Sequence, residues 1–448
     1  MAAVNKTSRL AVDPRRHIGV ASVIAVFMAV LVLSPFTYAA RVKIEHAINS
    51  GHGQAYIDAT TQIADLFNKS QDEIEVEVTV LTNYNEAIIV RVAGGAAPDA
   101  LTTNRYGDFA GRNMLYPMDE FLARSGLERR FVPAALEHGR WDGKLVQLPL
   151  FVQPAVTYYN TWLFDQAGVE SPNELDARGA WNWDTLIEVG KKIARDTTGD
   201  GILDVYATGG SWVSIERMIF WVGQSGAYYF NRFTNPTESA VRTPEFERAL
   251  NYVHSLAHQH RITEVNGLTG MPSTMFTNGM AGTAFDGPWF IATIRSAGMP
   301  DDSWDVAPIL TGPAGKPAFI HVDGVQIASA SPNPESVWKW FAFLTADTEA
   351  NEILIQVGNR PTAYIPTLMK YTDMITIGGY PRHAKTFWEI LTTASEAIPI
   401  VPLVLNTNRI FSAHSVAMNR FLCGEQSVTA TIEELHHSFT QILAESID

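Results

Sequence analysis

The pattern that most limits the possible folds is a strand, a helix and a second strand near the start of the chain. Residues 42–48 form a short apolar-rich run that ends at a turn-forming stretch. Residues 74–80 alternate strictly between apolar and polar side chains, as a half-buried strand does. Between them, apolar residues recur at helical spacing: Tyr56, Ala59, Ile63, Leu66 and Phe67. Because parallel strands are usually joined by a crossover helix, this order predicts an α/β fold.

The rest of the chain adds elements of the same two kinds. Short strands are expected at 100–103 and around 145–150, and helices at 183–194, 245–260, 334–344 and 431–443. The sequence contains no internal repeat and no flexible linker. At roughly 150 residues per domain, a chain of 448 residues is expected to form two or three domains with sizeable cores.

The amino end is typical of an export signal. Basic residues at positions 6, 9, 15 and 16 precede an uncharged apolar run at 18–33, and small residues follow up to Ala40. We expect residues 1–39 to be a signal peptide, because the apolar run is shorter than the ~20 residues that span a bilayer. An uncleaved membrane anchor is the alternative. Export would place the mature protein most simply in a Gram-negative periplasm.

The net charge limits which molecules the protein can bind, and the cysteine content limits how its fold can be stabilised. Removal of residues 1–39 changes the formal charge from −14 to −17, because four basic side chains and one acidic side chain are lost. This balance disfavours nonspecific binding to nucleic acid, whose phosphates attract a basic surface. Cys423 is the single cysteine, so no disulfide can form within the chain and stability depends on packing.

A loop rich in Asp and Gly is the clearest candidate metal site. Asp196, Asp200 and Asp204 have the spacing that begins a calcium-binding loop. A neutral Thr198 stands at the third position, and Ala207 stands where a bidentate Glu would complete such a loop. The alternative is therefore a turn in which the carboxylates accept hydrogen bonds from nearby amides. No other cofactor is expected.

Catalytic motifs are weak in this sequence. The segment 223–226 lacks the spacing of a serine nucleophile elbow. His254 and His258 lie one helical turn apart, but the Glu of the zinc protease pattern is missing. Paired carboxylates for glycoside hydrolysis stay open, because such residues are distant in sequence. We therefore expect a protein that is not an enzyme.

Several aromatic residues stand near Gly, Pro, Asp or Asn and outside periodic apolar faces: Trp141, Tyr159, Trp212 and Trp289. A sugar has apolar C–H faces rimmed by hydroxyl groups. A sugar site therefore requires flat rings for stacking and a few polar side chains at the rim. The alternative for each ring is packing in a core.

Short motifs in a fixed order give the chain a family resemblance. They are Gly94-Gly95-Ala96-Ala97-Pro98-Asp99, Asn113-Met114-Leu115-Tyr116-Pro117-Met118-Asp119, Gly143-Lys144, Tyr158-Tyr159-Asn160, Ala167-Gly168-Val169, Trp181-Asn182-Trp183, Phe276-Thr277-Asn278-Gly279 and Gly287-Pro288-Trp289. In this order and spacing the chain resembles the extracellular solute-binding proteins of bacterial ABC importers, in the sugar-binding branch that includes maltose-binding protein. One position departs from the pattern, because the usual Pro-x-Thr-Trp is Ala180-Trp181-Asn182-Trp183.

The resemblance implies a two-lobed periplasmic binding protein fold (type II-like) that the chain crosses three times. It places lobe 1 at 41–151 and 323–371, and lobe 2 at 152–322 and 372–448. It also implies a monomer that holds a small sugar ligand between its lobes and delivers it to ABC transporter permease subunits in the inner membrane. No bond would be made or broken in the sugar.

The resemblance also indicates which loops face the ligand. The candidate ligand-binding residues are Asn49, Ser50, His52, Thr103, Asn104, Gln153, Trp212, Asp286, Trp289, Asp323 and Arg360. For Asp286 and Arg360 the alternative is a structural ion pair. Two other functions stay open. One is a secreted carbohydrate-active enzyme, and the other is the same fold with iron or a polyol phosphate as its cargo. Tyr158 and Tyr159 would be the iron ligands, although neighbours on a strand point to opposite faces.

Overall fold

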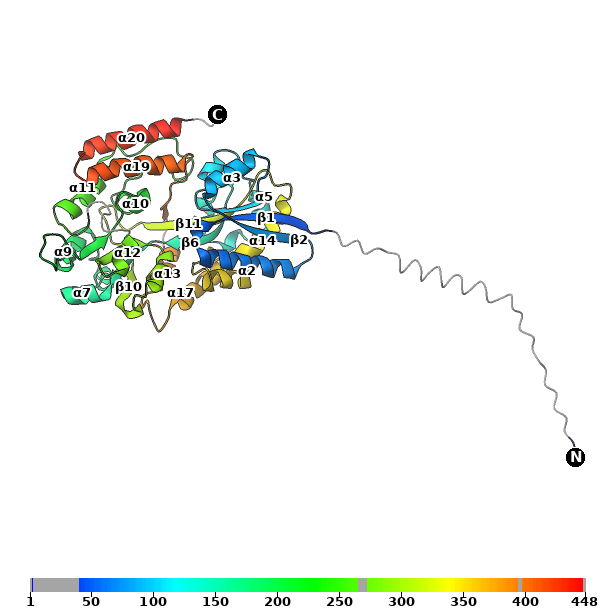
Figure 1. Ribbon diagram of the computed structural model, residues 1–448, viewed down its shortest axis with the longest axis horizontal. Coiled ribbons are helices and arrows are strands. Elements are labelled where there is room, and N and C mark those ends of the chain that lie inside the picture. Colours follow the sequence, from blue (N-terminus) through cyan, green and yellow to red (C-terminus); the bar gives the residue numbers. More distant parts are fainter. Residues whose placement is uncertain (1, 3–39, 265–271, 394–396, 446–448) are drawn as a thin grey trace. The chain divides into compact units, whose positions relative to one another are not determined.

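The computed structural model describes residues 2, 40–264, 272–393 and 397–445 (Figure 1). Val42–Asp448 form one compact unit, and the segment before it is a separate unit. The predicted signal peptide at 1–39 lies outside the described residues apart from Ala2. In the part of the chain that is described, no helix combines the length and the apolar character needed to cross a membrane.

The larger of two main sheets confirms the predicted strand–helix–strand start. Its strand order is β12-β11-β3-β1-β2, and β6 also pairs with β11. β1 runs parallel to β2 and to β3, whereas β11 runs antiparallel to β3 and β6. The bounds are β1 Val42–Asn49, β2 Ile74–Leu81, β3 Ala100–Thr103, β6 Leu148–Pro154, β11 Ala318–Ile327 and β12 Ala397–Pro399.

Amphipathic helices cover this sheet. The predicted helix is α2 (Gln54–Ser70), which buries Tyr56, Ala59, Ile63 and Phe67. These side chains join a core with residues of α14 (Pro334–Ala346) and α15 (Thr348–Gln356). Burial of one face at helical spacing is what the sequence pattern predicted. We call this sheet and the helices packed on it the first lobe.

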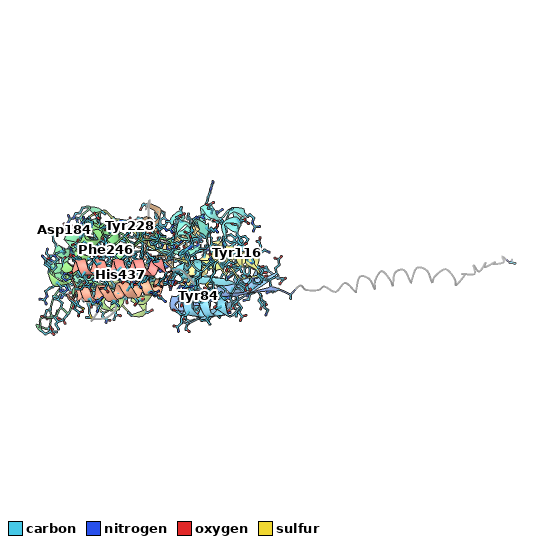
Figure 2. All side chains as sticks on the ribbon, turned by 90° about the horizontal axis from the view of Figure 1, so that it is seen from above. Tyr84, Tyr116, Asp184, Tyr228, Phe246 and His437 are labelled. Carbon is cyan, nitrogen blue, oxygen red and sulfur yellow. The ribbon has the colours of Figure 1, made fainter. Side chains whose placement is uncertain are left out.

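A second sheet has four strands in the order β10-β7-β9-β8. Its strands are β7 Val156–Asn160, β8 Tyr206–Gly209, β9 Ala281–Asp286 and β10 Trp304–Ala307. Every residue of β7 is buried. The core on this sheet contains residues of α9 Trp183–Ile193, α10 Ile215–Gln224, α11 Pro244–His258, α19 Thr407–Leu422 and α20 Val428–Ala444. We call this sheet and its helices the second lobe. In Figure 1, α19 and α20 run alongside each other, and Figure 2 labels Phe246 of α11 and His437 of α20 in this lobe.

Shorter elements complete the described chain. The helices are α3 Tyr84–Ala93, α4 Gly107–Ala110, α5 Asp119–Ser125, α6 Pro133–His138, α7 Thr161–Ala167, α8 Pro172–Ala177, α12 Pro272–Thr277, α13 Trp289–Ser296, α16 Ile365–Leu368, α17 Lys370–Ile375 and α18 Thr386–Thr393. The 3-10 helices are Ser50–His52, Glu128–Arg130 and Asp301–Ser303, and a small ribbon joins β4 Arg140–Trp141 to β5 Lys144–Leu145.

The chain passes between the sheets at strand ends. One residue, Ala155, separates β6 of the first sheet from β7 of the second. The chain returns between β10 and β11, and it enters the second lobe again after β12. The boundaries predicted at 151/152, 322/323 and 371/372 fall inside β6, β11 and α17. The exact extents of the lobes stay a prediction.

The start of α19 is held by a side chain of the first lobe. Asp108 of α4 accepts hydrogen bonds through Oδ1 from the backbone N–H groups of Asn406, at 2.7 Å, and Thr407, at 3.3 Å. The side chain of Asn406, the N-cap residue, makes no capping hydrogen bond. A Cβ atom at Gly107 would stand 2.7 Å from the carbonyl oxygen of Val404, so only glycine allows this close approach. Asp108, from the first lobe, therefore supplies the side-chain acceptor that the N-cap residue Asn406 does not provide.

Candidate ligand-binding site

Polar residues gather where strands of the first sheet end. β1 and β3 are parallel neighbours, so the residues after both strands lie at one edge of the sheet. His52 follows β1, and Asn104 and Arg105 follow β3. His321 of β11 lies opposite Gln153 of β6 in the antiparallel register. Ligands of open α/β sheets bind at such carboxyl ends, so this edge is the natural place for a site.

Two cavities lie at this edge. The first has a volume of about 240 Å³ and is lined by Gly51, His52, Asn104, Arg105, Gln153, Glu216, Arg217, Trp289, His321, Asp323, Arg360 and Ile400. The second has a volume of about 360 Å³ and is lined by Asn49, Gly51, His52, Asn83, Tyr84, Asn85, Glu86, Thr103, Asn104, Arg105 and Asn408. The cavities share four lining residues and are therefore adjacent. We call the first the inner cavity and the second the outer cavity.

Asp323 is the central charged group of the inner cavity. Its side chain is 2% exposed. Its Oδ2 atom accepts hydrogen bonds from Gln153 Nε2 at 2.9 Å and from Arg360 Nη1 at 3.2 Å. His52 Nε2 lies 3.8 Å from Oδ1. Arg360 also donates to the carbonyl oxygen of His52 at 2.8 Å, so the arginine holds the loop after β1 against β11.

Burial and the neighbouring cations set the protonation of this cluster. Burial acts to raise the pKa of Asp323, but His321, His52, Arg360 and the hydrogen bond from Gln153 outweigh it, and the pKa is lowered. Burial lowers the pKa of His52 to about 4, against the attraction of Asp323. At neutral pH, Asp323 is therefore ionised and His52 is uncharged.

The second lobe contributes Trp289 and an arginine to the inner cavity. The Trp289 ring meets the His321 ring edge-on, with centroids 5.2 Å apart. A Cβ atom at Gly287 would stand 2.1 Å from the Trp289 ring, so glycine is needed for this ring position. Arg217 Nη2 donates to both oxygens of Asp286, at 3.1 and 3.0 Å. Burial raises the pKa of Asp286, and the attraction of Arg217 offsets only part of that rise.

One ion pair in the cavity wall joins the two lobes. Arg105, after β3, donates through Nη2 to Glu216 Oε1 at 3.1 Å. Glu216 lies in the first turn of α10. The Arg105 guanidinium also lies over the ring of Phe411, 4.6 Å from its centroid, in a cation–π contact with α19.

The structure brings most of the candidate binding residues together. His52, Asn104, Gln153, Trp289, Asp323 and Arg360 line the inner cavity. Asn49 and Thr103 line the outer cavity. Ser50 lies in the 3-10 helix after β1 but is not among the lining residues of either cavity. Asp286 is not among the lining residues of the inner cavity, and its carboxylate is bound by Arg217, which is one of them.

Trp212 lies elsewhere. The indole is 2% exposed and packs in the core of the second lobe against Trp221, with ring centroids 5.3 Å apart. Its Nε1 atom donates to Thr263 Oγ1 at 3.1 Å. The ring is therefore a core residue, the alternative considered for every aromatic candidate, and no face of it lines either cavity.

Six residues that line the inner cavity were missing from the sequence-based set, and four of them carry charged or titratable side chains. The six are Gly51, Arg105, Glu216, Arg217, His321 and Ile400. Arg105 directly follows two predicted candidates, so an extension of the loop by one residue would have found it. His321 lies two residues before Asp323 on a strand, which puts both side chains on one face. Glu216 and Arg217 carry no such signal, because the preceding strand, β8, was not predicted.

The Asp-rich loop uses its carboxylates locally. Asp196 accepts hydrogen bonds from the backbone N–H groups of Thr198, Gly199 and Gly201 at 2.6 to 3.1 Å. Asp200 accepts from Ile202, and Asp204 accepts from Thr197 and Thr198. Across the described ranges, no group of three or more His, Cys, Asp or Glu residues is arranged to hold a metal ion. These hydrogen bonds are those of the Asp and Gly turn that is the alternative to a calcium site, and calcium binding by the loop stays a prediction.

Comparison with known proteins places the chain in a family. A family model described as bacterial extracellular solute-binding protein matches residues 53–351. A maltotriose-binding protein of Pyrococcus abyssi is 23% identical over 304 residues, which are 66% of this chain and 60% of that protein. A binding protein of Brucella abortus is 26% identical over 247 residues, 53% of this chain and 55% of that protein. The chain thus spans little more than half the length of these curated relatives.

Solved structures agree with this assignment at the level of the fold. An ABC substrate-binding protein from Listeria monocytogenes, in complex with cycloalternan, has a TM-score of 0.74 and 21% identity, with 90% of this chain and 98% of that chain covered. The sugar-binding protein MalE from Xanthomonas citri has a TM-score of 0.74, 20% identity and the same coverage. The two-lobed α/β fold predicted from the sequence is confirmed. Because the family model covers most of the chain, this protein belongs to the family of bacterial extracellular solute-binding proteins.

Proposed function

We propose that this protein is the substrate-binding component of an ABC importer, and that it captures a sugar between its lobes in the periplasm. It then delivers the sugar, as a monomer, to permease subunits in the inner membrane. The relatives named above include proteins described as maltotriose-binding and sugar-binding, which supports a carbohydrate as the cargo.

The inner cavity is the observation that carries this proposal. It combines an aromatic ring, Trp289, with charged and amide side chains from both lobes. Within the described structure, three buried atoms in its wall have no hydrogen-bond partner: His52 Nδ1, Gln153 Oε1 and Asp323 Oδ1. Buried polar atoms are costly when they are left unpaired. The arrangement therefore suits a ligand with an apolar face and several hydroxyl groups.

A ligand held between the lobes would favour their closed arrangement, and the permease would recognise that arrangement. Residues from both lobes line the inner cavity, so a ligand there contacts both. A ligand shifts an open–closed equilibrium only through contacts that are better in one state. A sugar that touches Trp289 on one side and Asp323 on the other would favour the closed form, by hinge motion of the lobes. No covalent step is part of this function.

A thermal-shift screen tests the proposal. Mono- and oligosaccharides and polyols are added to the purified mature chain, and the melting temperature is measured. A ligand at 100 times its Kd adds about 2.7 kcal/mol to the free energy of unfolding. We expect at least one carbohydrate to raise the melting temperature in a concentration-dependent way. A panel that produces no shift would contradict the sugar-binding function.

Replacement of Trp289 by Ala is expected to weaken sugar binding by at least ~1 kcal/mol, about fivefold in Kd, because a stacked ring contributes about 0.5–1.5 kcal/mol beyond its buried area. The fold should persist, since Trp289 lies at the cavity and is only partly buried. Isothermal titration calorimetry measures the affinity. Trp162→Ala is the matched control, because that ring is 49% exposed on α7 and lines neither cavity. Unchanged affinity in Trp289→Ala would remove this ring from the binding site.

The iron alternative finds little support at Tyr158 and Tyr159. The Tyr158 hydroxyl donates to the carbonyl oxygen of Gly287 at 2.8 Å, and burial raises its pKa. Burial likewise raises the pKa of Tyr159, whose hydroxyl lies 3.4 Å from Asp305 Oδ2. An iron-binding tyrosine must lose its proton, which these surroundings oppose. Colourless protein after incubation with ferric citrate is the expected result.

The enzyme alternative has its own test. Hydrolysis of an aryl glycoside or an oligosaccharide by the purified protein, lost in Glu216→Gln or Asp323→Asn, would favour it over binding. We expect no turnover, because Asp323 and Glu216 are each bound to an arginine and neither is placed as a free acid.

A further inference from the structure

The charged groups at the inner cavity are matched one to one. Arg360 pairs with Asp323 at 3.2 Å, Arg217 with Asp286 at 3.0 Å, and Arg105 with Glu216 at 3.1 Å. All three arginines line the inner cavity, and each has its own carboxylate. Three arginines are therefore matched by three carboxylates, and two imidazoles, His52 and His321, lie 3.8 Å from Asp323.

From this pairing we infer that the inner cavity selects a neutral sugar and discriminates against anionic derivatives of that sugar, such as uronates and sugar phosphates. The inference rests on the proposed function and specifies the class of its ligand. It also argues against polyol phosphate, one of the alternative cargoes.

The physical reason lies in what an anion would meet. To bind an arginine, a ligand carboxylate or phosphate must displace the carboxylate already there, or sit beside it as a like charge. Displacement leaves a buried acid such as Asp323 without its cation, and removing one partner of a buried pair is strongly unfavourable. An anionic ligand placed next to Glu216 or Asp323 without displacing it is repelled by that carboxylate, which also weakens binding of the anion. A neutral hydroxyl avoids both costs.

Hydrogen-bonding capacity gives the same preference. Asp323 Oδ1 and Gln153 Oε1 are acceptors without a hydrogen-bond partner in the described structure. The amide orientation of Gln153 is fixed, because its Nε2 atom donates to the ionised Asp323, which can only accept. A hydroxyl group can donate to such acceptors. Carboxylate and phosphate oxygens at neutral pH offer acceptors only.

The Arg105–Glu216 pair is the place where this preference can be altered. It is the least buried of the three pairs, with side chains 33% and 27% exposed. Its partners come from different lobes, so neither is needed to hold a single core together. Loss of the Glu216 charge frees the Arg105 guanidinium for an anionic ligand. Glu216 is therefore the specificity-determining residue of this proposal.

Matched ligand pairs test the inference in the mature wild-type protein. Melting temperature and calorimetry are compared for glucose with glucuronate and glucose 6-phosphate, for galactose with galacturonate, and for maltose with maltobionate. We expect the neutral member of the binding pair to have a Kd at least tenfold lower than its anionic counterpart. Equal or tighter binding of an anionic member would overturn the inference and leave the sugar-binding function standing. A pair built on the sugar that the thermal-shift screen identifies is added to this set, and if no carbohydrate binds, the proposed function itself fails.

The variant Glu216→Gln keeps the shape of the side chain and removes its charge. We expect it to reduce the preference for the neutral ligand by about tenfold or more, mainly through tighter binding of the anion. Glu170→Gln is the matched control. It makes the same change in an exposed pair with Arg178, with side chains 53% and 57% exposed, and Glu170 lines neither cavity. An unchanged ratio of affinities in Glu216→Gln, with both proteins folded, would show that the ion pairs do not set the charge preference.

Discussion

Acidification from pH 7 to pH 5 is expected to remove on the order of 8 kcal/mol from the free energy of unfolding, about 2 kcal/mol for each of four buried imidazoles. Burial lowers the pKa of His46 and His138 to about 3, and the pKa of His52 and His414 to about 4. The expected loss is comparable with the total stability of a typical domain, ~5–15 kcal/mol.

The protein loses stability on acidification because the unfolded chain takes up more protons than the folded protein. An unfolded histidine has a pKa of about 6.5, so below that pH the unfolded chain binds protons that the folded imidazoles refuse. The stability contributed by these groups is complete well above pH 6.5, and it is lost as the pH falls through 6.5 toward the pKa values of the folded groups. At His46 the cause is burial, and the Nδ1 atom of the buried ring accepts a hydrogen bond from Trp340 Nε1 at 3.1 Å. Burial raises the pKa of Asp286, so this carboxyl group adds stability as the pH falls and offsets part of the loss from the histidines.

Denaturant unfolding at pH 7, 6 and 5 measures this loss. His46→Gln should flatten the pH dependence by about one quarter, because glutamine can replace the neutral hydrogen bonds but does not titrate. His437→Gln is the matched control, since His437 is exposed on α20 (Figure 2). A stability that stays constant between pH 7 and pH 5 would contradict the expected neutral burial of these imidazoles.

Replacement of Arg360 by Met is expected to cost about 3–5 kcal/mol of stability at pH 7, because it leaves Asp323 charged, buried and without its cation. Methionine keeps much of the side-chain volume, so the lost charge is the main change. The penalty should shrink at acid pH. Without Arg360 the pKa of Asp323 rises, and a protonated Asp323 no longer needs a cation.

Two comparisons separate this effect from a general loss of an ion pair. Lys339→Met breaks an exposed pair with Glu73 and should lower the stability far less than Arg360→Met does, because solvent screens exposed ion pairs. The double variant Arg360→Met/Asp323→Asn should recover part of the stability, because the buried charge is gone. A cost for Arg360→Met as small as that for Lys339→Met would show that Asp323 is not held by the arginine.

The first lobe could be predicted from sequence to a greater extent than the second. β2 alternates at its start, with Ile74 and Val76 buried and Glu75 and Glu77 exposed, and α2 carries a clear apolar face. The second sheet was missed because its strands lack alternation. Every residue of β7 is buried, so both faces require similar side chains, and β8 and β10 have only four residues each.

The binding residues were also predicted better where the sequence carries a clear local pattern. The family motifs indicated loops after β1 and β3, and the residues there reach the two cavities. Trp212 and Trp289 stand in similar sequence surroundings, yet one packs in the core and the other lines the cavity. Their difference is set by tertiary packing, namely the Trp221 ring beside Trp212 and the close approach of Trp289 to Gly287. No local sequence signal carries that information.

The cap that Asp108 places on α19 has a consequence for how the lobes can separate. A sliding motion that carried α19 away from α4 would strip two backbone N–H groups of their acceptor, near the tight contact between Gly107 and Val404. A rotation about that point would keep all three contacts. The amino end of α19 thus acts as a fulcrum beside the outer cavity, whose wall includes Asn408 of the same helix.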